Sequence, residues 1–186
     1  MNKRRMLLLA ATLLVAFTSG GCGYNTLVTK QQNVRRAWSD VDSNLQRRAD
    51  LIPNLVETVK GYAKQEQTVI GEVANARAAL LGAHSKQDEI NANNQLSGAI
   101  GRLLLLQENY PQLKSNENFL RLQDELAGTE NRIAVDRRDY NEAIKKYNTD
   151  VEIFPKNLAA SIFGFHRDDA YFQATAQEKQ VPQVKF

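Results

Sequence analysis

Histidine, cysteine and paired carboxylates, the residues that most often do chemistry, are sparse in this 186-residue chain. The two histidines, His84 and His166, stand far apart, and with a single cysteine they form no group with zinc-ligand spacing. Four carboxylates make two close pairs, Asp136 with Asp139 and Asp168 with Asp169. Both pairs stand among basic residues, which indicates a solvated face rather than an acid–base pair. Because glycine-rich phosphate loops and nucleophile elbows are also missing from the sequence, we expect no catalytic residue, cofactor or metal.

Four charged residues differ from the rest because they interrupt or flank rows of apolar residues; they are Arg48, Glu66, Glu130 and Arg137. A buried charge must be paired, since leaving it alone is strongly destabilising. One interpretation is a polar layer between two predicted helices, the first over 34–80 and the third over 115–154. Such a layer would set the register of the two helices and would have no catalytic role. The alternative is that Arg48 and Glu66 extend their charged ends into water.

Cys22 is the residue whose position indicates a modification. Basic residues 3–5 precede an apolar stretch, 6–17, and small residues 18–21 follow, which is the order of an export signal. The arrangement resembles the signal of bacterial lipoproteins, in which the cysteine is acylated and becomes the new N-terminus. We therefore expect a signal peptide at 1–21 and attachment to the lipid bilayer through Cys22.

The alternatives for this N-terminus are a plain signal peptide or an uncleaved short anchor with an incidental cysteine. Ser19 departs from the leucine that such signals usually have three positions before the cysteine. Gly23 follows the cysteine, where an aspartate would resemble an inner-membrane retention signal. These features predict a bacterial envelope protein that faces the periplasm or the outside, with the outer membrane favoured over the inner.

The charge balance argues against nucleic acid as a partner. The chain has 24 Lys and Arg against 21 Asp and Glu, and three of the basic residues lie in the first five positions. The remainder is therefore balanced, with 21 of each sign. A nucleic-acid binder needs a basic face that displaces counterions from phosphates, and no large basic excess is present to supply one.

Apolar residues at seven-residue spacing predict the helices that position the charged groups. Two rows run from Val34 to Leu80 and predict one helix, kinked where it passes through Pro53. The alternative is a break, with Asp50 as the N-cap of a second helix. Beyond a stop at Gly82, a Ser-x-x-Asp capping box predicts a helix over 86–109, with its most buried turn at 103–106. Tyr110-Pro111 ends that helix.

A third helix is expected from Ser115 to Phe154. Its seven-residue row consists of Phe119, Leu126, Ile133, Tyr140, Tyr147 and Phe154. Together with the scarcity of breakers, 10 Gly and 4 Pro, these patterns predict an all-α fold. We expect an elongated antiparallel bundle of three long helices, or four if the first breaks at Pro53.

The predicted domain organisation has four parts. A signal peptide at 1–21 and a lipid attachment site with a short linker at 22–26 precede the helical bundle at 27–154. Residues 155–186 lack the long apolar period, and predict a short helix, a turn at Gly164 and an extended tail that docks on the bundle or binds a partner.

Several stretches resemble the LemA family of bacterial membrane-attached helical proteins. They include Tyr24-Asn25-x-Leu27-Val28, Asp50-Leu51-Ile52-Pro53-Asn54-Leu55-Val56, Tyr110-Pro111-x-Leu113-Lys114, Thr129-Glu130-Asn131-x-Ile133 and Phe154-Pro155. The resemblance covers about residues 24–186 and implies a helical bundle at a membrane, without an established enzymatic activity. Two features depart from the family pattern: Gln65 stands where many members have His, and the apolar N-terminal stretch ends at a cysteine instead of spanning the membrane.

These observations predict a non-enzymatic envelope protein that serves as a structural or interaction scaffold. Its helix faces or its tail would contact another envelope protein, which no motif in the sequence identifies. The alternatives are a regulator or adaptor of a membrane protease or sensor, and an envelope hydrolase.

Overall fold

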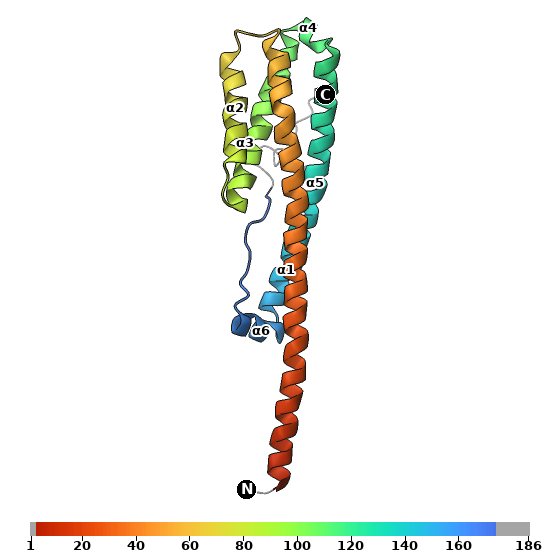
Figure 1. Cartoon of the computed structure of the whole chain (residues 1–186), viewed down its shortest axis with the longest axis vertical. Helices are drawn as coiled ribbons and strands as arrows, with labels where there is room; N and C mark the ends of the chain where they lie inside the picture. The colour runs from red at the N-terminus through yellow and green to blue at the C-terminus, as the bar shows by residue number, and fades with distance from the viewer. Residues whose placement is uncertain (1–2, 174–186) are drawn as a thin grey trace, which may run out of the picture. The chain divides into compact units, whose positions relative to one another are not determined.

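The computed structural model describes residues 3–173, with side chains from residue 23 onward (Figure 1). Its elements are α1 (Lys3–Lys60), α2 (Gln67–Leu81), α3 (Lys86–Leu105), the 3-10 helix η1 (Leu106–Glu108), α4 (Pro111–Lys114), α5 (Glu117–Glu152) and α6 (Lys156–Phe163). No strand occurs within residues 3–173, so the predicted all-α fold class is confirmed. The side chain of Cys22 and the end of the predicted tail, residues 174–186, lie outside the described part of the chain.

The chain divides into two compact units, and both contain parts of the long helices α1 and α5. Unit 1 combines residues 1–39 with 139–169, and unit 2 combines residues 40–138 with 170–186. Within unit 2, the helices pack as a bundle in which α1 and α5 run in opposite directions (Figure 1). The expected antiparallel arrangement of the first and third long helices is thus found in this unit.

The first long helix passes through Pro53 without a break, but it is shorter than the sequence predicts. A continuous helix to Leu80 is wrong, because α1 ends at Lys60 and α2 begins at Gln67. Gly61 follows the last helical residue, and the N–H groups of Tyr62 and Ala63 both bond to the carbonyl of Val59. The apolar rhythm continues after this turn because α2 buries a face of its own, made of Ile70, Val73, Ala76 and Leu80.

The predicted connection between α2 and α3 is confirmed. Gly82 follows α2, and the Ser85 Oγ accepts a hydrogen bond from the Asp88 N–H at 3.1 Å. This bond satisfies one of the free donors at the start of α3. The expectation that residues 103–106 are all deeply buried is wrong at Leu105, whose side chain is 65% exposed. Leu103 and Leu106, which lie three positions apart on the inner face, are buried instead.

Helix α5 buries the seven-residue row that predicts it. Phe119, Leu126, Ile133, Tyr140 and Tyr147 are buried. The Asn116 Oδ1 accepts a hydrogen bond from the Phe119 N–H at 2.9 Å, which explains why the helix begins at Glu117. The sixth residue of the row, Phe154, is 77% exposed because α5 ends before it, at Glu152.

The predicted short helix and turn near the C-terminus are also present, in unit 1. Helix α6 ends at Gly164, whose φ of 74° lies in the left-handed region that a side chain disfavours. The N–H groups of Gly164 and Phe165 both bond to the carbonyl of Ala160. The chain therefore leaves α6 in a defined direction, with Phe165 packed against a small core of Leu27, Ala159 and Ala160.

Candidate functional site: a buried polar layer in unit 2

Arg48 is the centre of a polar layer that joins three helices of unit 2. It lies on α1 and is only 4% exposed. Its Nη1 lies 2.7 Å from the Glu130 Oε2 of α5. The same nitrogen donates to the Asn93 Oδ1 at 3.0 Å and to the Ser97 Oγ at 2.9 Å, both on α3. The guanidinium therefore links α1 to two other helices of unit 2, α3 and α5.

The partners of Arg48 are themselves held in place. Asn93 is fully buried, and the Ser97 Oγ donates to the Asn93 carbonyl at 3.0 Å, within α3. The Glu130 side chain is 41% exposed, so one end of the ion pair reaches solvent. Since half-exposed carboxylates lose less hydration than buried ones, this geometry lowers the total desolvation cost of the ion pair.

The electrostatics of the layer follow from this mixed burial. Burial lowers the pKa of Arg48 from its ordinary value. The negative charge of Glu130 acts in the opposite direction, and the positive charge of Arg137 lowers the pKa further. An arginine begins so far above neutrality that it stays a cation here, and the layer carries a permanent buried charge.

Two further contacts extend the polar layer along α1. The Asn44 Nδ2 donates to the Asp136 Oδ2 of α5 at 2.7 Å, which adds a second polar contact between these helices. The Arg77 Nε of α2 donates to the Ala49 carbonyl at 2.9 Å. That carbonyl lies four residues before Pro53, which has no N–H to offer it. Arg77 therefore supplies the donor that the proline removes from the helix.

The structure brings together only part of the predicted layer. Arg48 is buried and paired with Glu130, so its charged end does not extend into water. Glu66 lies elsewhere, because α1 ends at Lys60 and places it in the turn before α2, where it accepts a hydrogen bond from the Tyr110 hydroxyl at 3.0 Å. Arg137 acts on Arg48 only through its charge, and its guanidinium lies 4.9 Å from the ring centroid of Phe172.

Several residues of the layer were not predicted from the sequence, namely Asn44, Asn93, Ser97 and Asp136. A usable signal existed for Asn93, which lies between Ile90 and Leu96 on the apolar face of α3 at helical spacing. An amide at such a position is a candidate for a buried hydrogen bond. No comparable signal marks Arg77, because its partner is a backbone carbonyl.

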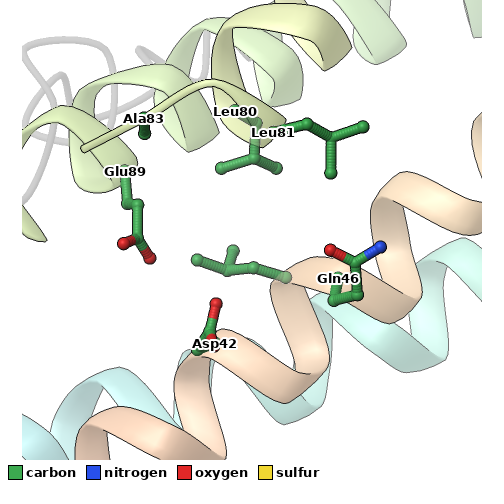
Figure 2. A pocket seen from close by; sticks show the side chains of 7 residues that line it. Asp42, Gln46, Leu80, Leu81, Ala83 and Glu89 are labelled. Atoms are coloured by element: carbon green, nitrogen blue, oxygen red, sulfur yellow. The ribbon is translucent and has the colours of Figure 1, made fainter. Parts of the chain in front are cut away.

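Two carboxylates line a small hollow in unit 2, apart from the polar layer. Its volume is about 120 Å³, and it is lined by Asp42, Leu45, Gln46, Leu80, Leu81, Ala83 and Glu89. Figure 2 shows the carboxylates of Asp42 and Glu89 facing this space from opposite helices. Burial raises the pKa of Glu89, the charge of Asp42 raises it further, and Lys86 acts against both. The lining includes no hydroxyl, thiol or imidazole that could act as a nucleophile or base beside these acids.

The two histidines of the sequence lie on the surface. His84 and His166 are both exposed, in the connection between α2 and α3 and in the segment after α6. Among the side chains that the structure describes, no three His, Cys, Asp or Glu residues form a group able to hold a metal ion. Within that same part of the chain, no helix has the length and apolar character needed to cross a membrane.

The described residues thus define an all-helical protein whose bundle is joined by a buried polar layer. The sequence model of the LemA family matches residues 37–186, and the chain belongs to this family. The run of residues 50–56, which carries the resemblance most specifically, lies in α1 around Pro53. Within this run, Ile52, Leu55 and Val56 are buried.

Three curated proteins that are similar to this chain come from Paramagnetospirillum, Magnetospirillum and Metamycoplasma. The chain is 29% identical to "Magnetosome protein MamQ 2" of Paramagnetospirillum magneticum, over 81% of this chain and 64% of that protein. It is 26% identical to "Magnetosome protein MamQ" of Magnetospirillum gryphiswaldense, over 96% of this chain and 76% of that protein. It is 24% identical to "Protein LemA" of Metamycoplasma hominis, over 83% of this chain and 71% of that protein. The chain thus spans less than two thirds of the length of the first of these relatives.

Proposed function

We propose that this chain is a non-enzymatic LemA-type protein, attached to a membrane of the bacterial envelope by a lipid on Cys22, which presents its helical bundle to another envelope protein. The observation that carries the scaffold role is the contact of Arg48 with Glu130, Asn93 and Ser97. These polar groups are directed at one another between helices. They are therefore suited to fix the packing of the bundle rather than to bind a substrate.

The order of residues around Cys22 supports the membrane attachment. Basic, apolar and small residues precede the cysteine as in lipoprotein signals. One acyl chain holds a protein only weakly to a bilayer, whereas two or more hold it firmly, so an anchor of this type gives stable attachment. Gly23 favours the outer membrane, with the bundle in the periplasm or outside the cell.

Metabolic labelling with a fatty-acid analogue tests the anchor. Wild-type chain should incorporate the label, and Cys22→Ser should not. Cys22 is the only cysteine in the chain, so a thiol elsewhere cannot replace it as the acyl acceptor. Equal incorporation in both chains would end the proposal of a lipid on this residue.

Affinity capture from cross-linked envelopes, followed by mass spectrometry, tests the scaffold role. We expect one or a few envelope proteins to be enriched with the wild-type chain over a capture from cells that lack it. The same capture with a chain truncated after Gln173 examines the tail. A membrane protease that is lost on truncation would favour the adaptor role instead, and no specific enrichment would contradict both.

A further inference from the structure

Unit 1 carries a large exposed apolar surface on and around α6. Its members are Tyr24, Ile153, Phe154, Leu158, Ile162 and Phe163, whose exposed fractions run from 40% at Tyr24 to 77% at Phe154 and Ile162. Leu158 and Ile162 are spaced by four within α6, so they lie on the same side of the helix, and Ile153 and Phe154 directly precede it. We call these six residues the α6 patch. A group of large, exposed apolar side chains of this kind indicates a site of contact with another surface.

The inner face of α6 explains why the large side chains point outward. Ala159 and Ala160 are buried, and they form a small core with Leu27 of α1. A Cβ placed on Gly23 would lie 3.4 Å from the Ala159 Cβ, so α6 packs closely on α1 at this point. The small residues therefore face the protein and the large apolar ones face away, the reverse of an ordinary surface helix.

The position of the α6 patch along α1 places it beside the residue that carries the proposed anchor. Tyr24 of α1 belongs to the patch, and its ring centroid lies 4.8 Å from that of Phe163. Cys22 stands only two residues before Tyr24 in the same helix, which corresponds to about 3 Å along the axis at the rise of an α-helix. Helices that lie in a bilayer interface bury their apolar face by about 5–10 Å, so the patch begins within that depth of the proposed lipid attachment.

We infer that the α6 patch lies in the interface of the bilayer to which the N-terminus is attached, as a second membrane contact. This inference rests on the proposed membrane attachment and adds a defined surface to it. Tyr24 suits this environment, because its ring is apolar and its hydroxyl can stay among the headgroups. The phenylalanine and aliphatic side chains supply the apolar face that such a contact buries.

The charges beside the patch predict that the contact is apolar rather than electrostatic. Lys156 is paired with Asp150 at 2.7 Å, and Arg167 is paired with Glu152 and Asp169. These cations are already neutralised within unit 1 and do not form a basic patch for anionic headgroups. The contact should therefore form on zwitterionic phosphatidylcholine and should resist added salt.

Quenching by brominated lipid tests the inference on the full chain. Trp38→Phe removes the only native tryptophan, and Ile162→Trp then reports on the patch. The matched control is Leu105→Trp, because Leu105 is also an exposed aliphatic residue, at 65%, but belongs to unit 2. Circular dichroism of each variant should match that of Trp38→Phe alone, since both positions that receive the new tryptophan are exposed.

In phosphatidylcholine vesicles with brominated acyl chains, we expect the emission of Ile162→Trp to fall about twofold relative to ordinary lipid, as for a ring at interfacial depth. Leu105→Trp should be unaffected, and added salt should change neither result. Vesicle flotation measured in parallel reports attachment separately. A chain that floats without quenching at position 162 would overturn the inference and leave the anchor intact. A chain that neither floats nor is quenched would overturn both.

Two further outcomes would also contradict the membrane contact. Emission from position 162 that shifts to the blue without quenching by brominated lipid would show that protein covers the patch, from a second copy or a partner. Equal quenching at positions 162 and 105 would show adsorption without a defined surface.

Discussion

At the scale of single residues, Arg48 is a buried charge whose pairing should matter for stability. A buried ion pair is not strongly stabilising overall, but removing one partner leaves the other charge uncompensated. Arg48 is nearly inaccessible to water, whereas the Glu130 side chain is 41% exposed. The two partners are therefore not equivalent, and the loss of the carboxylate should be the more damaging change.

We expect Glu130→Ala to lower the free energy of unfolding by about 2 kcal/mol, because it leaves a buried guanidinium with only neutral partners. Urea denaturation measures this change. The matched control is Glu142→Ala, on the same helix, whose carboxylate is paired with Lys146 and whose side chain is 57% exposed. An exposed pair should contribute about 0.5 kcal/mol or less. Equal losses in the two variants would contradict a buried, register-setting layer.

The carboxylate of Glu89 should make stability depend on pH. Its pKa is raised in the folded chain by burial and by Asp42, so the folded state binds this proton more tightly than the unfolded state does. The stabilising contribution is fully present below the ordinary glutamate pKa and is lost as the pH rises through the raised value. Asp42→Asn should lower the pKa of Glu89 and reduce this loss.

A carboxyl NMR titration of Glu89, with urea denaturation at acidic and neutral pH, measures both effects. Asp40→Asn is the control, because Asp40 is an exposed aspartate two positions away in α1 and is not among the charges that shift Glu89. A Glu89 pKa that stays unchanged in Asp42→Asn, or that falls equally in both variants, would contradict a specific interaction across the hollow.

At the scale of elements, the sequence predicts the helices that have a regular apolar spacing, but it does not predict the turn between α1 and α2. Helix α5 follows from one apolar row, and the start of α3 follows from Ser85 and Asp88. The turn between α1 and α2 was missed because apolar spacing is similar on both sides of it. Gly61 and the polar residues 64–67 were the available signals there. The polar layer was predicted only where a charge interrupts a row, as at Arg48.

Arg77 shows how one helix compensates for a proline in another. The Ala49 carbonyl is buried, and without an N–H at position 53 it accepts a hydrogen bond from the Arg77 Nε. We expect Arg77→Met to cost about 1 kcal/mol, the net value of one hydrogen bond. In a Pro53→Ala background the same substitution should cost less, because the backbone N–H of the new alanine would supply the missing donor within α1.

Thermal or urea unfolding of the four chains completes this double-mutant cycle, with a coupling of about 1 kcal/mol expected between positions 53 and 77. Pro53→Ala should be stabilising by itself, since alanine is favoured inside a helix. Additive effects would mean that Arg77 acts through packing alone.

At the scale of the whole molecule, the family match and the membrane attachment concern different parts of the chain. The LemA family model matches residues 37–186, so Cys22 and the apolar stretch before it lie outside that match. Membership in the family therefore concerns the part of the chain that forms the helical bundle and does not extend to the proposed lipid attachment. The lipid anchor therefore has to be tested on this chain itself. A direct test is whether residues 1–21 are removed from the protein in the membrane.

Cleavage before Cys22 would change the charge of the entire protein. The chain has a net charge of +3 and an isoelectric point near 9.0, and its excess of basic residues lies in residues 3–5. We expect protein isolated from membranes to lack residues 1–21, to begin with acylated Cys22 and to focus near neutrality. Intact mass spectrometry and isoelectric focusing measure this change, and Cys22→Ser is expected to keep residues 1–21 and to focus near 9.0.

Ser19→Leu, which brings the signal closer to the usual lipoprotein pattern, should be processed at least as completely as the wild type. A wild-type chain that retains residues 1–21 in the membrane fraction would show that the apolar stretch itself is the anchor.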